Sequence, residues 1–312
     1  MKIFYWSPFT SNVATIKAVI NSAIGLKHIY NHDISIINTI GEWNKFKDIL
    51  KKNNLRIIDK NYLLKMNSDG YFRSRLIYTI IFLKSFMFLK KILIKEKPDF
   101  LIIHLITSLP IILFIIFNFK TKLILRVSGL PKLGFFRRFL WKIASKKINI
   151  ITVPSIHTLK HLRKLKIFNS NKVYYLPDPI LDKRLVKITK TKIKHSNFIV
   201  NVGRLTKQKN QKMLIKSFKI ISEKYKNLKL LILGKGELKK NLLKQINELS
   251  LTKKVFLLGH IKNPNYYIKK SLCVIVSSLW EDPGFVMIES SRLKKMVICS
   301  DCPNGPKEFF RN

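Results

Sequence analysis

The sequence has little acid. Its 312 residues include 17 Asp and Glu against 60 Lys and Arg, which gives a formal net charge of +43. A surface of this kind attracts anions, nucleic acids and anionic lipids. Lys, Asn and Ile are also abundant together, which is the pattern that an AT-rich coding sequence produces. The charge alone therefore does not name a partner.

Cysteine is scarce as well. Cys273, Cys299 and Cys302 are too few for a disulfide framework, and this favours a reducing compartment. The C-x2-C formed by Cys299 and Cys302 has no second pair with which to hold zinc. The opening MKIFYWSP has the pattern of a first β-strand and lacks the features of a secretory signal. We therefore expect a cytoplasmic protein.

One long hydrophobic run, residues 100–119, is apolar enough for a membrane span. It also contains internal start and stop signals. FLIIHL follows Pro98-Asp99 and has strand character, and Thr107-Ser108 with Pro110 is a helix-start signal. A strand followed by a buried helix accounts for each of these features, and a transmembrane helix remains the alternative.

The rest of the chain alternates apolar strands with amphipathic helices. This alternation predicts an α/β protein with parallel sheets covered on both faces. The segment KVYYLPDPI and the charged connector after it divide the chain near residue 185. We expect two doubly wound Rossmann-like domains, over residues 1–185 and 186–312, with ligands beyond the carboxyl ends of the strands.

The first candidate site in the second domain is VGRLTKQKN, residues 202–210. Gly203 allows a tight turn after the strand. Arg204 and Lys209 follow in the loop before a helix, and two cations at a strand end suit a diphosphate. In a chain so rich in Lys, a solvated loop is the alternative. A second strand end, LILGKGE, has only two of the glycines of a dinucleotide fingerprint and is also typical of an ordinary strand-to-helix turn.

The third strand end is SSLWEDPGFVMIESS, residues 277–291. The turn at Gly284 precedes a predicted helix that begins near Phe285, and such a helix N-terminus attracts phosphate. Glu281 lies in the loop and Glu289 about one turn into the helix. Two carboxylates on either side of the turn can accept hydrogen bonds from sugar hydroxyls. For Glu289 alone, a favourable contact with the helix dipole is the simpler explanation.

GRLTKQKN, LILGKGE, VFLLGHIKN, SSLWEDPGFVMIE and SDCPNGPKE occur in this order. Together they resemble the nucleotide-sugar half of the retaining glycosyltransferase family 4, which has the GT-B fold of two Rossmann-like domains facing across a cleft. Glu281 and Glu289 match the E-x7-E pair of that family. The likeness is close over residues 198–310. The first domain matches more loosely, through its topology and through His104 at a strand end.

This resemblance implies a role for each matching residue. Arg204 and Lys209, after the turn at Gly203, would neutralise the nucleotide diphosphate. Glu281 would face the transferred sugar, and His104 would reach the same sugar from the first domain.

The resemblance also implies which residues contact the ribose, the phosphates and the base of the donor. Glu289 would hold the ribose hydroxyls, the backbone at Gly284 and Phe285 would bind the phosphates, and His260 would lie beside the base.

No cofactor is expected. The family retains the anomeric configuration, and the leaving phosphate takes the proton of the acceptor. Preorganised cations and N–H groups stabilise the charge that develops on the leaving group, and the sequence has no D-x-D pair for a divalent ion. The nucleotide-sugar, with a UDP-sugar expected, is a substrate.

Three departures from the family bear on these expectations. DPGF stands where GFGL is usual, and SPFTSNVA after the first strand has no glycine, so that Ser11 and Asn12 are only guesses for acceptor contacts. The resemblance also implies further elements after Asn312, so the second domain is expected to be incomplete or unusually short.

The basic residues also have a local pattern. The stretch 131–147 mixes Phe, Trp and Leu with basic residues that include Arg137, Arg138, Lys142, Lys146 and Lys147, and it has no acid; the predicted helix 72–95 is similar. Apolar and basic faces together suit a membrane interface, which predicts a place on the inner leaflet. Core helices with Lys on their outer faces are the alternative.

Two functions remain. The first is a glycosyltransferase that uses a nucleotide-sugar donor and a glycan or lipid-linked acceptor in the biosynthesis of cell-envelope polysaccharide such as capsule or lipopolysaccharide. The second is a basic nucleic-acid-binding α/β protein. The second predicts cations in one groove with stacking aromatics, whereas the Lys residues are spread along the whole chain, so no specific nucleic-acid partner is expected.

Overall fold

A computed structural model describes residues 1–9, 15–60, 71–131, 133–180 and 193–310. Contacts within the chain divide it into two compact units, Met1–Pro179 and Ile180–Asn312. The division falls a few residues before the boundary that the sequence predicts at residue 185. Ser11 and Asn12 lie outside the described residues.

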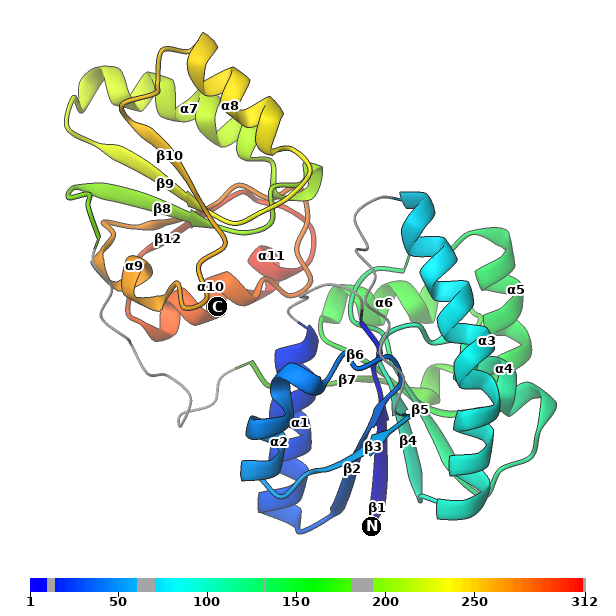
Figure 1. Ribbon diagram of the computed structural model, residues 1–312. Helices are drawn as coiled ribbons and strands as arrows, with labels where there is room; N and C mark the ends of the chain where they lie inside the picture. The colour runs from blue at the N-terminus through cyan, green and yellow to red at the C-terminus, as the bar shows by residue number, and fades with distance from the viewer. Residues whose placement is uncertain (10–14, 61–70, 132, 181–192, 311–312) are drawn as a thin grey trace. The chain divides into compact units, whose positions relative to one another are not determined.

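Unit 1 contains a seven-stranded parallel sheet in the order β3-β2-β1-β4-β5-β6-β7 (Figure 1). Its strands are β1 (Lys2–Trp6), β2 (Asp33–Asn38), β3 (Arg56–Asp59), β4 (Phe100–Ile103), β5 (Lys122–Arg126), β6 (Ile148–Val153) and β7 (Val173–Tyr175). The strand order reverses between β1 and β4, so the carboxyl ends of these two strands flank the usual ligand position of a doubly wound sheet.

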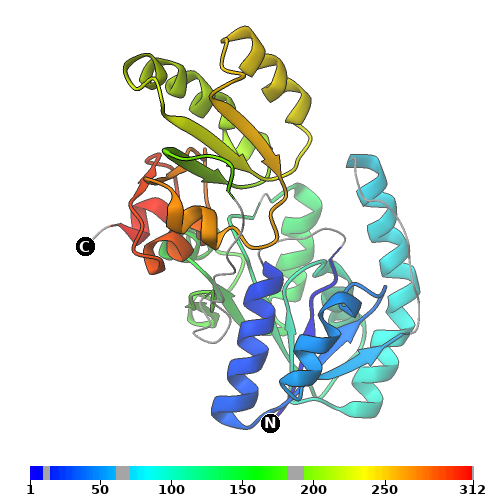
Figure 2. The same cartoon turned by 60° about the vertical axis from the view of Figure 1, so that its left-hand side comes forward.

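Helices cover both faces of this sheet, as Figures 1 and 2 show. They are α1 (Thr15–Tyr30), α2 (Lys47–Lys52), α3 (Tyr71–Glu96), α4 (Ser108–Ile116), α5 (Phe135–Ala144) and α6 (Ile156–Lys164). One core cluster joins α1 and α2 to the sheet, and a second joins α3, α4, α5 and α6 to its opposite face. Alternate side chains of each strand supply the two clusters, as a two-sided parallel sheet requires.

The hydrophobic run at 100–119 is a strand and a helix. It forms β4 and then α4, whose residues Leu109, Ile111 and Leu113 are fully buried. The strand-and-buried-helix prediction is confirmed. Over the described residues, no helix combines the length and the hydrophobicity needed to cross a bilayer.

Unit 2 contains a five-stranded parallel sheet in the order β10-β9-β8-β11-β12. Its strands are β8 (Phe198–Val202), β9 (Lys229–Leu233), β10 (Val255–Gly259), β11 (Val274–Val276) and β12 (Val297–Cys299). Its helices are α7 (Gln211–Lys224), α8 (Lys239–Glu248), α9 (Asn265–Lys270), α10 (Phe285–Arg292) and α11 (Gly305–Phe309), with a short 3-10 turn, η3 (Lys207–Lys209), before α7. Separate apolar clusters lie on the two faces of the sheet.

The strand order of unit 2 explains why its loops converge. Strand β8 lies between β9 and β11, and the order reverses at β8 and β11. Because the strands are parallel, the loops after β8, β9 and β11 emerge at one edge of the sheet. These loops carry Gly203, Gly234 and Glu281, so the topology brings the three candidate segments of the second domain together.

Candidate functional site

Two loops of unit 2 are joined through their backbones. Gly203 N–H donates to the Leu233 carbonyl at 2.9 Å, and Leu205 N–H donates to the Lys235 carbonyl at 3.0 Å. A Cβ added at Gly234 would lie 1.8 Å from the Gly203 carbonyl oxygen. The pair of glycines in LILGKGE therefore has a packing role, since it lets the loop after β9 approach the loop that carries Arg204.

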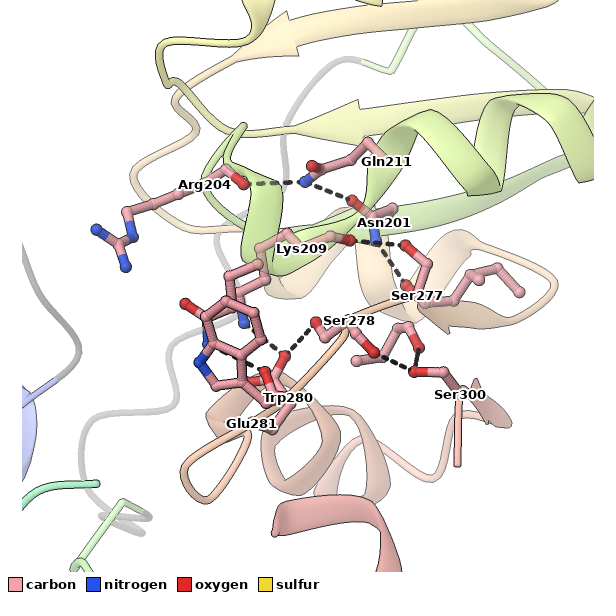
Figure 3. Close-up of polar contacts among 12 residues, drawn as sticks. Asn201, Arg204, Lys209, Gln211, Ser277, Ser278, Trp280, Glu281 and Ser300 are labelled. Atoms are coloured by element: carbon pink, nitrogen blue, oxygen red, sulfur yellow. Dashed lines mark hydrogen bonds and ion pairs between the residues drawn. The ribbon is translucent and has the colours of Figure 1, made fainter. Parts of the chain in front are cut away.

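The turn η3 is bound to the loop after β11 by three hydrogen bonds. Leu279 N–H donates to the Gln208 carbonyl at 2.8 Å, Gln208 Nε2 donates to the Trp280 carbonyl at 3.0 Å, and Ser277 Oγ donates to the Lys209 carbonyl at 2.9 Å. These bonds fix the position of Lys209 relative to the loop that contains Glu281 (Figure 3). The two segments predicted separately from the sequence thus form one site.

At the centre of this site, Lys209 Nζ and Glu281 Oε1 are 2.5 Å apart. Ser278 Oγ donates a hydrogen bond to the same carboxylate oxygen. The Glu281 side chain is only 6% exposed and the Lys209 side chain 18%. A buried carboxylate needs such partners because its desolvation is otherwise costly. The aliphatic part of Lys209 lies against Gly203, where an added Cβ would be 3.3 Å from its Cγ and Cδ.

The turn between Glu281 and α10 is held by a second turn, at 303–305. Glu281 N–H donates to the Pro303 carbonyl at 3.3 Å, and Asn304 Nδ2 donates to Asp282 Oδ1. A Cβ added at Gly305 would meet the Pro283 carbonyl at 2.0 Å. Gly284 has φ +91 and caps α10, and this left-handed conformation favours glycine. Contacts with residues 303–305 therefore hold the DPGF turn at residues 282–285 in place.

Helix α10 begins at Phe285, as predicted, and Glu289 lies in its second turn. Both side chains are partly exposed. The N–H groups of the first turn have no partners within the helix, so this end of α10 favours an anion. Glu281, on the loop before the helix, and Glu289, within it, therefore lie on either side of that helix start along the chain.

Arg204 and His260 have exposed side chains. The Arg204 guanidinium extends away from the Lys209–Glu281 pair in Figure 3, while its carbonyl accepts a hydrogen bond from Gln211 Nε2 at 3.0 Å. His260 follows Gly259, which ends β10 with φ +74. Both residues lie at the same sheet edge as Glu281, where a ligand can reach them.

His104 belongs to unit 1. It follows β4, its backbone N–H donates to the Trp6 carbonyl at 3.0 Å, and its side chain is buried. Burial and the nearby Arg126 guanidinium lower the pKa of His104 to about 3, so the imidazole is neutral near pH 7. Its Nδ1 has no hydrogen-bond partner within the described residues. His104 therefore presents a neutral imidazole at the carboxyl end of the sheet.

Several supporting residues were not singled out from the sequence. Gln211 and Asn201 are buried and tie the Arg204 carbonyl to α7 and to β11 through Gln211 Nε2 and Asn201 Nδ2. Ser278 and Asn304 fix the two ends of the Glu281 turn. Ser278 and Gln208 stand within the segments 277–291 and 202–210, so their polarity next to the candidate residues was the available signal.

The arrangement has the components for binding a diphosphate ester. It combines two cations, the start of α10 and carboxylates that can accept hydrogen bonds from sugar hydroxyls. Across the residues that the structure describes, no three His, Cys, Asp or Glu side chains are grouped so as to hold a metal ion.

Several known proteins similar to this chain are glycosyltransferases. A family model described as glycosyl transferases group 1 matches residues 183–312. The uncharacterized glycosyltransferase MJ1059 of Methanocaldococcus jannaschii is 36% identical over 280 residues, which cover 81% of this chain and 67% of that protein. An N-acetylgalactosaminyltransferase of Campylobacter jejuni, named for a diphospho-undecaprenol substrate, is 42% identical over 113 residues, 36% of this chain and 30% of that protein. The chain thus spans about two thirds of the first relative and less than a third of the second.

Solved structures show the same fold. The HepE protein of Anabaena in complex with UDP superposes with a TM-score of 0.69 at 14% identity, over 100% of this chain and 84% of that one. A TarM variant of S. aureus, in a complex that contains UDP, gives a TM-score of 0.70 at 14% identity, over 100% of this chain and 88% of that one. These neighbours are GT-B glycosyltransferases, so the predicted fold, an α/β protein with two Rossmann-like units, is confirmed. By its family match and its likeness to MJ1059, the chain belongs to the group 1 glycosyltransferases.

Proposed function

We propose that this chain transfers a sugar from a UDP-sugar to a glycan or lipid-linked glycan acceptor, with retention of the anomeric configuration, in the biosynthesis of a cell-envelope polysaccharide. The observation that carries this proposal is the contact between Lys209 and Glu281 beside the start of α10. It brings a cation, a carboxylate and a helix N-terminus together in one place, and these groups suit a phosphate and a sugar hydroxyl. The resemblance to glycosyltransferase family 4 and its E-x7-E pair supports the same assignment.

In this proposal the donor diphosphate binds between Arg204, Lys209 and the backbone N–H groups at Gly284 and Phe285. Arg204 is exposed and carries its charge at the sheet edge, where it can make forked hydrogen bonds to phosphate oxygens. Lys209 contacts Glu281, and we propose that it shares its ammonium group with the phosphate when the donor binds.

Two residues are proposed to recognise the nucleoside. Glu289 would accept hydrogen bonds from the ribose hydroxyls, since it is partly exposed within α10. His260 would lie beside the base, because it follows β10 at the same sheet edge as the phosphate-binding loops. A uridine base is supported by the relatives that were solved with UDP.

The reaction breaks the bond between the sugar anomeric carbon and the phosphate oxygen, and UDP leaves with the electron pair. The acceptor oxygen forms its bond on the same face of the sugar, and its proton passes to the leaving phosphate. Charge develops on that phosphate as the bond breaks, so Arg204 and Lys209 would stabilise the transition state more than the bound substrate. Glu281 and, from unit 1, His104 are proposed to contact the sugar.

We also propose that this mechanism requires no metal or cofactor. Arg204, Lys209 and the N–H groups would supply the positive charge that a divalent ion supplies in other transferases. The alternative of a nucleic-acid-binding protein has no comparable support, because membership of the family points to a transferase.

The anomeric outcome tests the proposal. The chain is incubated with each of several α-linked UDP-sugars and the first-formed free or transferred sugar is followed by proton NMR. Retention predicts the α-anomer before mutarotation, with the same rate in excess EDTA. A β-product contradicts retention, and loss of activity in EDTA that a divalent ion restores contradicts metal independence.

Two variants test the assigned residues. Glu281→Gln is expected to lower kcat by about a hundredfold, since it removes a charge aimed at the reacting sugar, whereas Lys207→Ala on the same loop is expected to leave kcat unchanged. Equal activity of Glu281→Gln and the unaltered chain contradicts the role of Glu281.

A further inference from the structure

Helix α5 of unit 1 exposes large apolar side chains. Phe135 is 90% exposed, Phe136 70% and Phe139 56%, and Ile143 is 43% exposed. The spacing of these residues places them along one side of the helix. Exposed aromatic residues grouped in this way are unusual on a protein surface and mark an interaction site.

The aromatic stripe is separate from the side of α5 that packs into the core. Trp141 and Ala144 are buried there, and the Trp141 ring lies 5.4 Å from the ring of Phe168. The three phenylalanines of α5 therefore lie outside the core, and the alternative that α5 is a core helix with only Lys on its outer face is wrong. Polar substitutions at Phe135, Phe136 and Phe139 are therefore expected to leave the core unchanged.

Positive charge borders the stripe and acid is lacking. Arg138 and Lys142 are exposed on the edge of the stripe, given the helical period. From residue 71 to 147 the sequence has two acidic residues, Glu96 and Asp99. Glu96 is bound to Lys2 at 2.6 Å and to Arg56 at 3.0 Å, so its charge is already neutralised.

Neighbouring helices on the same side of the sheet have the same character. Helix α4 packs against both α3 and α5, and all three join the same core cluster. On α3, Leu83, Met87 and Ile94 are 68%, 54% and 53% exposed, at spacings that form a second stripe. Four lysines flank it, Lys84, Lys90, Lys91 and Lys95. We call the exposed residues of α3 and α5 the apolar–basic face.

We propose that the apolar–basic face docks on a bilayer that contains anionic phospholipid. The phenylalanines of α5 would insert at the level of the headgroups and upper acyl chains, and the Arg and Lys side chains would bind the headgroup phosphates. Inserted aromatic residues flanked by cations are what an interfacial helix requires, and none of the described helices is long and apolar enough to cross the bilayer.

The composition of the face favours lipid over the other anionic partners. A nucleic acid would use cations together with stacking aromatics, and it would leave Leu83, Met87, Ile94 and Ile143 in water. A bilayer covers these aliphatic side chains and the phenylalanines alike. The docking does not depend on the donor or on the reaction proposed above, although it would bring a transferase to a lipid-linked acceptor.

The experiment is flotation with vesicles at physiological ionic strength, where the attraction between well-separated charges is largely screened and contacts between partly buried groups are screened much less. The vesicles contain phosphatidylcholine alone or with phosphatidylglycerol. The test variant is F135S/F136S/F139S. The matched control is M213S/I220S/L243S on α7 and α8 of unit 2, where the three side chains are 56%, 72% and 42% exposed. Neither variant changes the net charge.

The unaltered chain is expected to float with the vesicles that contain phosphatidylglycerol and to remain largely at the bottom with phosphatidylcholine alone. The test variant is expected to bind the vesicles at least about tenfold more weakly, because it lacks the three aromatic groups that would insert into the bilayer. The control is expected to bind like the unaltered chain. Circular dichroism melts check that both variants fold, as the exposure of the replaced residues predicts.

Three results would overturn the proposal. The first is equal flotation of the test variant and the unaltered chain, and the second is an equal loss in the control. The third is failure of the unaltered chain to float with anionic vesicles, whether or not this face binds RNA or a protein.

Discussion

At the scale of single residues, the central feature is a carboxylate kept in an otherwise basic protein. Glu281 is buried and depends on Lys209 and Ser278, which both contact Oε1. A buried ion pair contributes little compared with apolar side chains of the same shape, but removal of one partner leaves an uncompensated charge. Stability alone therefore does not account for the pair, which suits the binding and catalytic role proposed for it.

This reasoning predicts the effect of breaking the pair. Lys209→Met should lower the free energy of unfolding by about 3 kcal/mol, because the Glu281 carboxylate loses its cation in a site with little water. Lys244→Met is the control, since the Lys244–Glu248 pair is 3.8 Å long and its side chains are 81% and 59% exposed. That change should cost less than about 0.5 kcal/mol. Urea unfolding measures both.

The double variant Lys209→Met/Glu281→Gln should recover part of the loss, since the buried charge is then gone as well. A Lys209→Met variant that is no less stable than Lys244→Met would contradict the account of the pair.

His104 gives a second prediction, for the pH dependence of stability. Its pKa is lowered from 6.5 to about 3 in the folded protein, mainly by burial. The unfolded chain therefore binds a proton below about pH 6.5 that the folded chain does not, and stability falls as the pH falls from 6.5 towards 3. Between about pH 7.5 and pH 5.5 this group removes about 1.4 kcal/mol.

Urea unfolding of unit 1 at the two pH values measures this effect. His104→Gln has no titrating group at this position and should lose about 1.4 kcal/mol less than the unaltered chain over the same interval. If both lose the same amount, His104 is not held neutral by its surroundings.

At the scale of elements, the loops of the candidate site are in close backbone contact. The backbones after β8 and β9 touch at Gly203 and Gly234, and those at 283 and 305 touch through Gly305. In these places a side chain of any size would separate two loops of the candidate site. The glycines thus determine how closely these loops approach each other.

Alanine substitution of two glycines tests this point. Gly234→Ala places a Cβ against the Gly203 carbonyl and should destabilise unit 2 by about 1–3 kcal/mol. Gly25→Ala in α1 has open space around the new Cβ and should stabilise the chain by up to about 1 kcal/mol. Thermal melts of the two variants should therefore move in opposite directions, and a neutral Gly234→Ala would show that the loops can separate.

Much of this element structure follows from sequence pattern. Helix α3 covers the predicted span 72–95, and α10 begins at the predicted Phe285. Strands β2, β3 and β7 were not predicted from the sequence. Strand β3 has only four residues and none of them is buried, so its apolar pattern is weak. The run of Ile residues in β2 was a usable signal.

Contacts between distant segments were harder to foresee. The pattern predicted that Lys209 and Glu281 lie at strand ends, but their contact depends on hydrogen bonds between η3 and the loop after β11. Likewise, the sequence of α5 does not say whether its phenylalanines face the core, because Trp141 and Ala144 supply an alternative buried side. Which loops touch and which side of a helix is buried depend on the packing of the whole unit.

At the scale of the whole molecule, the chain consists of two doubly wound units with different surfaces. Unit 2 carries the candidate donor site, and unit 1 carries His104 and the apolar–basic face. A net charge of +43 favours anionic ligands everywhere, so weak binding of a nucleotide is not informative by itself. Informative binding must depend on particular residues of the site.

The most direct test of the donor site is the melting temperature of the chain with UDP, GDP, ADP and CMP. A ligand present at about a hundred times its Kd stabilises the folded state by about 2.7 kcal/mol. We predict a rise with UDP that is lost in Arg204→Ala and kept in Lys207→Ala, since Arg204 is proposed to bind phosphate and Lys207 is only a charge on the same loop. No rise with any nucleotide, or an equal rise in both variants, would contradict a donor site at the edge of the unit 2 sheet.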